Sequence, residues 1–143
     1  MKKKIFALIL AVSMVFTLGV PAFASEKAGL SSPGSGIHVM WENTGMVTAC
    51  LNFSGDRAEC TSEIYAKSGT TKIVATGLLK RVNSNGTTTV KHWTVTSYGD
   101  TLYFDKQYYV SSGYTYEFEI DAKVYRNGTV EYVSETDSDY CGG

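Results

Sequence analysis

From residue 37 onward the chain is a succession of short runs in which apolar and polar side chains alternate with a period of two. The run over residues 116–125 is the clearest, with one set of alternate positions that is apolar throughout: Tyr116, Phe118, Ile120, Ala122 and Val124. Successive side chains of a β-strand point to opposite faces, so this pattern predicts a strand with one face buried. No stretch keeps a helical period over three turns, and we therefore expect an all-β protein.

Turn-forming residues separate the runs and set their number. Gly, Asn, Asp and Ser gather between segments rich in Thr, Val, Ile, Tyr and Phe, as is typical of an antiparallel sandwich. The segments expected as strands are residues 37–42, 46–53, 57–66, 72–82, 88–97, 101–110, 114–125 and 129–135. The most secure turn is Asn127-Gly128, because Asn-Gly favours positive φ at both central positions of a tight hairpin. Two stacked antiparallel sheets would bury one face of every segment.

Matching the apolar faces fixes the pairing of the second and third segments. A short loop over residues 54–57 brings their apolar sets together when Phe53 lies opposite Ala58, Leu51 opposite Cys60, and Val47 opposite Ile64. The same alternation puts Cys60 with the core residues and Cys50 on the opposite side.

The segment that enters the seventh strand is similar to a corner of immunoglobulin-like and fibronectin-type sandwiches. There a Tyr at the strand start turns its ring into the core and returns its hydroxyl to backbone upstream. Tyr116 is the candidate, because it shares the face of Phe118 and Ile120. We expect Trp93, in the middle of a long strand, to be the buried indole, and Trp41, in a shorter peripheral run, to be half exposed.

The first 36 residues indicate export and then a flexible connection. Residues 1–24 combine three lysines, an apolar run and the small-residue tripeptide Ala22-Phe23-Ala24, which predicts a signal peptide cleaved after Ala24. Residues 25–36 are rich in Gly and Ser, so we expect a flexible lead before a single domain over residues 37–143. The expected location is extracellular, with no integral membrane anchor after cleavage.

The charge of the exported chain limits its partners. Removing the three signal lysines from 13 basic residues leaves 10 against 14 acidic ones, a formal charge of about −4. Nucleic acids and anionic membranes both require basic patches. We therefore expect neither as a partner, and favour a carbohydrate or a protein at the cell exterior.

Three cysteines in an exported chain predict one disulfide and one leftover thiol. Since Cys50 and Cys60 fall on opposite faces, a bridge between Cys60 and Cys141 is the first choice. A bridge between Cys50 and Cys141, the local Cys50–Cys60 pair, or no bridge remain as alternatives.

No motif for catalysis or cofactor binding is present, so we expect a protein that is not an enzyme and has no cofactor. Glu117, Glu119 and Asp121 share one outward face, yet carboxylates in this pattern are typical of any solvated sheet. Metal-ligand spacings of Cys and His are missing. The sequence leaves calcium binding open, should Asp100, Asp105 and Asp121 converge.

Aromatic residues are the unusual part of the composition, at 13% of the chain with 10 Tyr. Tyr and Trp present an apolar body with a polar tip, which suits recognition of sugars or proteins. The candidate binding residues are those expected to point outward or to lie at an edge: Tyr65, Tyr103, Tyr125, Tyr132 and Trp41. The alternative is that outward tyrosines stabilise the sheets through cross-strand pairs.

Several segments resemble a family of small secreted β-sandwich proteins from Gram-positive bacteria that carries no assigned function. The similar segments are residues 57–61 (RAECT), 68–73 (SGTTKI), 90–93 (VKHW), 109–116 (YVSSGYTY) and 122–129 (AKVYRNGT). The resemblance implies a β-sandwich, export, and cysteines at positions such as Cys60 and Cys141. It implies no catalytic or binding residue.

The sequence thus favours a secreted, non-enzymatic β-sandwich that acts as an extracellular or cell-wall-associated binding module. A secreted effector, such as an inhibitor or a bacteriocin-like or toxin-like protein, is the alternative. A carbohydrate-active enzyme comes third.

Overall fold

The computed structural model describes residues 41–143, so the predicted signal peptide (1–24) and lead (25–36) lie outside the described residues. The described part of the chain is built from eight strands: β1 (Thr44–Val47), β2 (Cys50–Ser54), β3 (Arg57–Ala66), β4 (Thr70–Asn83), β5 (Gly86–Tyr98), β6 (Thr101–Tyr109), β7 (Tyr114–Arg126) and β8 (Thr129–Cys141). Over these residues no helix has the length and apolar character that a membrane crossing requires.

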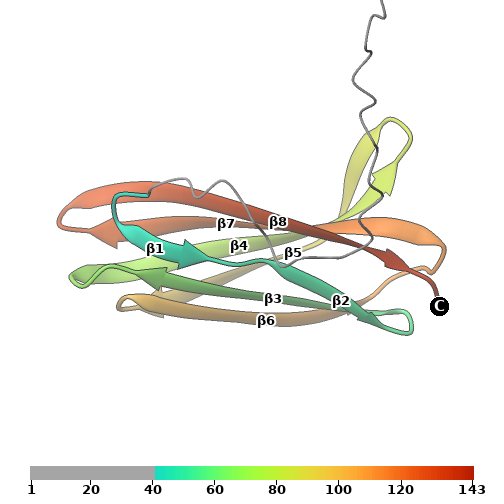
Figure 1. Ribbon diagram of the computed structural model, residues 1–143, viewed down its shortest axis with the longest axis horizontal. Helices are drawn as coiled ribbons and strands as arrows, with labels where there is room; N and C mark the ends of the chain where they lie inside the picture. Colours follow the sequence, from blue (N-terminus) through green and yellow to red (C-terminus); the bar gives the residue numbers. More distant parts are fainter. Residues whose placement is uncertain (1–40) are drawn as a thin grey trace, which may run out of the picture. The chain divides into compact units, whose positions relative to one another are not determined.

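The strands form two antiparallel sheets that pack face to face (Figure 1). In sheet A, β3 is central, with β6 on one side and β1 and β2 following one another along the other side. In sheet B the order is β5-β4-β7-β8. The predicted all-β class and two-sheet sandwich are confirmed.

The strand map differs from the sequence expectation at both ends. Most of the run expected at 37–42 lies outside the described residues, and Trp41 and Glu42 are not in a strand. The run expected at 46–53 is interrupted after Val47, which divides it between β1 and β2. β8 continues to Cys141 because it stays paired with β7, although acidic residues occupy its inward positions there and mask the alternation.

The predicted register of the first hairpin is confirmed. Val47 lies opposite Ile64, and the β2–β3 ladder pairs Leu51 with Cys60 and Phe53 with Ala58. The last hairpin also turns as expected, because Asn127 and Gly128 have φ values of 51° and 76°.

The two sheets meet closely where Phe104 of β6 lies against the backbone of Gly77 in β4. A Cβ added to Gly77 would stand 2.3 Å from the ring, at Cζ of Phe104. Phe118 of β7 and Trp93 of β5 complete the contact, with ring centroids 5.6 and 6.2 Å from that of Phe104. The core around them contains the buried apolar residues of both inner faces, among them Leu51, Ala58, Cys60, Ile64, Ile73, Ala75, Leu79, Leu102, Ile120 and Val124.

Of the two aromatic side chains expected in the core, Tyr116 lies as the sequence indicates and Trp93 does not. The Tyr116 side chain is only 2% exposed, and its hydroxyl donates a 2.8 Å hydrogen bond to the Ser111 carbonyl. Trp93 packs against the core but is only half buried. The reason is that β5 is an edge strand of sheet B, so one side of the indole remains open.

On the opposite edge, carboxylates of β8 close the gap between the sheets. Glu131 accepts hydrogen bonds from the backbone N–H groups of Glu42 and Asn43 and from the Thr44 hydroxyl. Asp137 accepts the Leu51 N–H at 2.8 Å. These bonds occupy backbone donors of β2 and of the segment just before β1 that would otherwise be exposed along this side of the sandwich.

The Gly77 contact leads to a stability test. Replacing Gly77 with Ala forces the Phe104 ring to move, and we expect the free energy of unfolding to fall by about 1–3 kcal/mol. Urea denaturation of the protein measures this change. The matched control is Gly45→Ala in β1, where the added Cβ has its nearest neighbour at 3.4 Å and should be tolerated. Equal stabilities for the two variants would contradict this packing.

Candidate binding surfaces

The five aromatic residues expected to bind a ligand lie in three separate places. Tyr65 and Tyr103 are on the outer face of sheet A, and Tyr125 and Tyr132 are on the outer face of sheet B. Trp41 precedes β1 and packs, half buried, against the edge of the core. The structure therefore contains no single platform made of all five.

Tyr65 and Tyr103 form a cross-strand pair that uses its own polar groups. Their ring centroids are 6.0 Å apart at 90°, and the two hydroxyl oxygens are 2.9 Å apart. This hydrogen bond, with smaller contributions from desolvation and from Glu63, raises the pKa of Tyr65 to about 12. Because the two hydroxyls are hydrogen-bonded to each other, we interpret this pair as a contact that stabilises the pairing of β3 with β6.

The outer face of sheet B carries two highly exposed aromatic rings. Tyr98 of β5 is 83% exposed and Tyr132 of β8 is 71% exposed. Between them, Lys72 lies with its Nζ 4.2 Å from the centroid of the Tyr125 ring, and the corresponding Lys123–Tyr132 distance is 5.6 Å. This end of the face therefore presents rings and ammonium groups together.

A groove of about 410 Å³ runs over the same face next to Tyr132. Val74 and Thr76 of β4 line one side, and Asp121 and Lys123 of β7 lie along the middle. The groove thus offers an apolar strip, a hydroxyl and both signs of charge beside an exposed ring.

Two outward carboxylates of β7 share one lysine. Lys80 of β4 lies with its Nζ 3.3 Å from Oε1 of Glu117 and in closer contact with Glu119. The hydrogen bond to Glu119 is the main cause that raises the pKa of Lys80 above its ordinary value. Both carboxylates therefore serve one ammonium group and do not face each other across a cleft, as glycoside hydrolysis would require.

The three aspartates considered for calcium do not converge. Asp100 lies in the β5–β6 turn, Asp105 on the outer face of sheet A, and Asp121 on the outer face of sheet B. Within residues 41–143 no three carboxylate, His or Cys side chains gather as a metal site would require.

The predicted disulfide between Cys60 and Cys141 is absent from the structure, which has three free thiols. Cys141 ends β8 with its Sγ 3.6 Å from the Gly55 carbonyl oxygen, whereas Cys60 lies further along β3, opposite Leu51. Cys50 is exposed on the outer face of sheet A, which also separates it from both buried cysteines. The alternation of faces was correct, but sharing a face did not bring the two buried thiols into contact.

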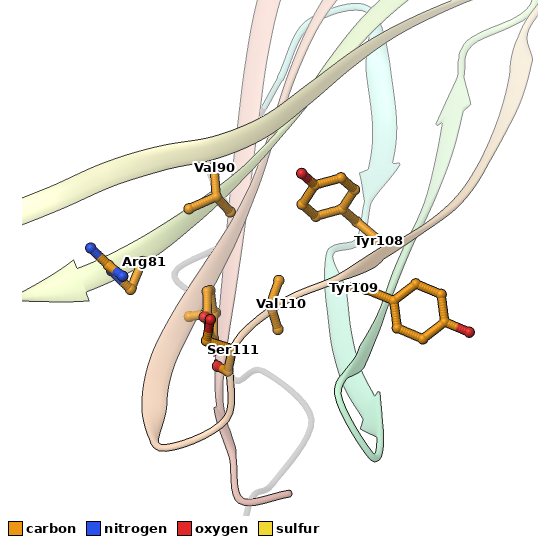
Figure 2. Close-up of a pocket in the computed structure, with 7 residues that line it drawn as sticks. Arg81, Val90, Tyr108, Tyr109, Val110 and Ser111 are labelled. Atoms are coloured by element: carbon orange, nitrogen blue, oxygen red, sulfur yellow. Dashed lines mark hydrogen bonds between the residues drawn. The ribbon is translucent and has the colours of Figure 1, made fainter.

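A second pocket, also of about 410 Å³, lies at the end of the sandwich where β6 leads into β7. Seven residues line it: Arg81, Val90, Tyr108, Tyr109, Val110, Ser111 and Tyr116. Figure 2 shows the Arg81 guanidinium and the Tyr108 ring on opposite sides of Val110, while the Tyr109 ring points away. The sequence analysis did not identify this site.

One signal in the sequence pointed to that pocket. Lys106 and Tyr108 follow Phe104 at alternate positions of β6, so they occupy inward positions although one is charged and the other has a polar tip. Such residues on an inner face indicate a place where the two sheets are not sealed.

Comparisons with known proteins add a distant likeness and no family. No family model matches the chain, and no curated protein matches it. The crystal structure of Spo0M, a sporulation control protein from Bacillus subtilis, is similar at a TM-score of 0.39 and 14% identity, over 68% of this chain and 49% of that one. The chain thus spans about half the length of that protein. The solution structure of R. palustris CsgH is similar at a TM-score of 0.36 and 16% identity, over 62% of this chain and 90% of that one.

The cysteine arrangement can be checked by counting thiols. For the protein purified without reductant, we expect three thiols per chain to react with Ellman's reagent after denaturation. In the native protein only the exposed Cys50 should react at pH 8, because Cys60 and Cys141 are buried. A single reactive thiol after denaturation would restore the disulfide and contradict the structure.

Burial of Cys60 also makes the stability of the protein depend on pH. It raises the pKa of the folded Cys60 thiol from 9.0 to about 12, so the unfolded chain loses this proton first as the pH rises. The contribution of this group to the unfolding free energy is therefore fully present below about pH 9. Above that pH it declines by at most about 1.4 kcal/mol per pH unit. Between pH 9 and 10.5 we expect a shallower fall of unfolding free energy in Cys60→Ala than in the parent chain. Parallel slopes would contradict the burial of this thiol.

Proposed function

We propose that the protein is a secreted, non-enzymatic binding module that contacts a carbohydrate of the cell exterior through the outer face of sheet B. The observation that carries the proposal is the combination on this face of exposed Tyr98 and Tyr132 with the groove beside Tyr132. A sugar ring has apolar faces and a polar rim, so it is met by flat aromatic rings with hydroxyl and charged groups around them.

The rest of the face suits such a ligand. Three hydroxyl side chains and one carboxylate occupy the row through the middle of the sheet, with Thr94 opposite Thr76 and Asp121 opposite Ser134. These groups can donate and accept hydrogen bonds along the strands. A surface of this composition is more polar than the centre of a typical protein–protein interface, where charged residues are depleted.

We further propose that the sandwich is of the immunoglobulin or fibronectin type. The strands can be given the letters of that fold: in sheet A, β2, β3 and β6 correspond to strands A, B and E. In sheet B, β5, β4, β7 and β8 correspond to strands C′, C, F and G. Tyr116 then stands near the start of strand F, the place of the tyrosine corner, and its bond to Ser111 supports the assignment. The chain departs from antibody domains at strand C, which has Gly77 in its middle and no tryptophan.

Export supports the extracellular setting of this function. The lysines, apolar run and small-residue cleavage pattern of residues 1–24 are the basis for secretion, and the resemblance to small secreted proteins favours a Gram-positive source. An extracellular or cell-wall-associated module of this kind needs no cofactor.

A glycan array with the processed protein tests the proposal. We expect a restricted set of glycans to bind, and binding to fall at least tenfold in Tyr132→Ala. Tyr103→Ala removes an exposed tyrosine from the opposite sheet and should leave binding unchanged, so it serves as the matched control.

Three outcomes would overturn this assignment. Equal loss of glycan binding in both variants would place the ligand elsewhere. No glycan binding together with specific capture of one protein would replace the carbohydrate by a protein partner. No binding to glycans and no captured protein, together with growth inhibition of a competing bacterium, would favour the effector alternative.

A further inference from the structure

The second pocket owes its position to a bend in sheet B. The β4–β5 pairing shifts between Leu79 and Lys80, which leaves Val90 as an extra residue of β5. Beyond this bulge the tip of the hairpin stands clear of the two sheets, as the yellow arm of Figure 1 shows. Arg81 and Val90 therefore project over the end of the core where sheet A no longer covers sheet B.

Arg81 carries a hydrogen-bond donor that the protein itself does not use. Its Nε is buried and has no hydrogen-bond partner among residues 41–143. The guanidinium carbon lies 4.8 Å from the centroid of the Tyr114 ring, which orients the group, and the side chain takes part in no salt bridge of the described chain. The Nη groups of the same guanidinium also make no hydrogen bond in the described chain and are not buried, so a ligand that supplies acceptors to them gains binding free energy.

The surroundings of Arg81 are also positively charged. Lys91 of β5 lies with its Nζ 5.4 Å from the centroid of the Tyr108 ring, and Lys106 precedes Tyr108 at the adjacent inward position of β6. The salt bridges of residues 41–143 involve Arg57 and Lys80 and none of these three cations. Asp139 of β8 lies opposite Tyr116 in the next strand, but the cations still outnumber it here, which favours an anionic ligand.

The remaining walls are apolar and aromatic. Val90 and Val110 line the pocket with the Tyr108 ring, and the Trp93 ring supports Tyr108 from the side at a centroid distance of 6.4 Å. The hydroxyl of Tyr116 is occupied by the Ser111 carbonyl, so Tyr116 contributes its ring to the base of the site. The pocket thus combines a ring-bearing wall with a cationic one.

We propose that this pocket binds an acidic sugar, a uronic acid residue, with its carboxylate on Arg81 and its ring against Tyr108. The guanidinium fork matches a carboxylate in two parallel hydrogen bonds. Only one cation lines the pocket itself, which suits a singly charged group better than a phosphate dianion. The volume of about 410 Å³ is near the lower end of the range for small-ligand sites, in keeping with a single sugar ring.

This inference is independent of the proposed glycan face. The pocket lies between inward positions of β4–β5 and the β6–β7 loop, whereas the groove at Tyr132 is on the outer face of sheet B. Variants in one site leave the other unchanged, so the two can fail separately.

Titration of the ¹⁵N-labelled, processed protein with methyl β-D-glucuronide tests the pocket. We expect saturable shifts at the Arg81 Nε–H and at the amides of Val110 and Ser111, with a Kd on the order of 1 mM as for a single sugar. Methyl β-D-glucoside, which lacks the carboxylate, should bind at least tenfold more weakly. Equal binding of the two sugars would overturn the role given to Arg81.

Variants locate the site. Arg81→Gln should weaken glucuronide binding at least tenfold, while Arg81→Lys keeps the charge without the fork and should recover only part of the affinity. Tyr108→Ala should also weaken it. Lys67→Gln removes one positive charge near the far end of β3 and should have no effect. Unchanged binding in both Arg81→Gln and Tyr108→Ala would overturn the proposal.

Two further ligands and a fold control complete the experiment. Inorganic phosphate that binds as tightly as the glucuronide would replace the sugar by a phosphate ligand, and N-acetylalanine that does so would replace it by a peptide carboxylate. Either result overturns the uronic acid assignment. Circular dichroism melting of each variant identifies those that fail to fold. If Arg81→Gln does not fold, the weaker glucuronide binding expected of Arg81→Lys tests the role of Arg81.

Discussion

The contact of the Phe104 ring with the backbone of Gly77 sets how closely the two sheets approach. No side chain separates the ring from β4 at this point, so β6 of sheet A presses directly on the centre of sheet B. Phe118 and Trp93 then pack around the same ring from β7 and β5. Side chains or backbone of β4, β5, β6 and β7 thus meet at one point between the sheets.

The two sides of the sandwich are closed in different ways. On the side of β8, Glu131 and Asp137 bind backbone N–H groups of the facing segments and seal the edge with charge-assisted hydrogen bonds. On the side of β5 and β6, no carboxylate makes such a bond within the described residues. The Ser97 hydroxyl donates to the Thr101 carbonyl near the turn, and further along the half-buried Trp93 faces Phe104 and Tyr108. The sealed side is a structural edge, whereas the open side leaves aromatic and basic groups available to a ligand.

Alternation in the sequence was sufficient to predict what depends on neighbouring segments alone. The inward set of β7, the pairing of Leu51 with Cys60, and the Asn127-Gly128 turn all follow from side-chain period and turn chemistry. The bond from Tyr116 was foreseen because its place in the corner is recognisable from local sequence.

Features that depend on which strands lie at an edge could not be predicted in this way. Trp93 is half buried because β5 has no neighbour on one side, and β8 extends past residue 135 because pairing with β7 continues where its inward residues are acidic. The separation of Cys60 from Cys141 depends on how two sheets are offset, which no single segment encodes. The same limit applies to the pocket: the inward Lys106 and Tyr108 indicate an unsealed place on β6, but the bulge at Val90 that completes the site gives no pattern of its own.

Nuclear Overhauser contacts of the Trp93 indole test the central claim most directly, because this residue reports both the packing of the sheets and the open side. The account predicts contacts from the Trp93 ring protons to the rings of Phe104 and Tyr108, together with contacts from the Phe104 ring to the Gly77 α-protons. A Trp93 indole without contact to either ring of β6 would contradict the sandwich packing and the pocket built on it.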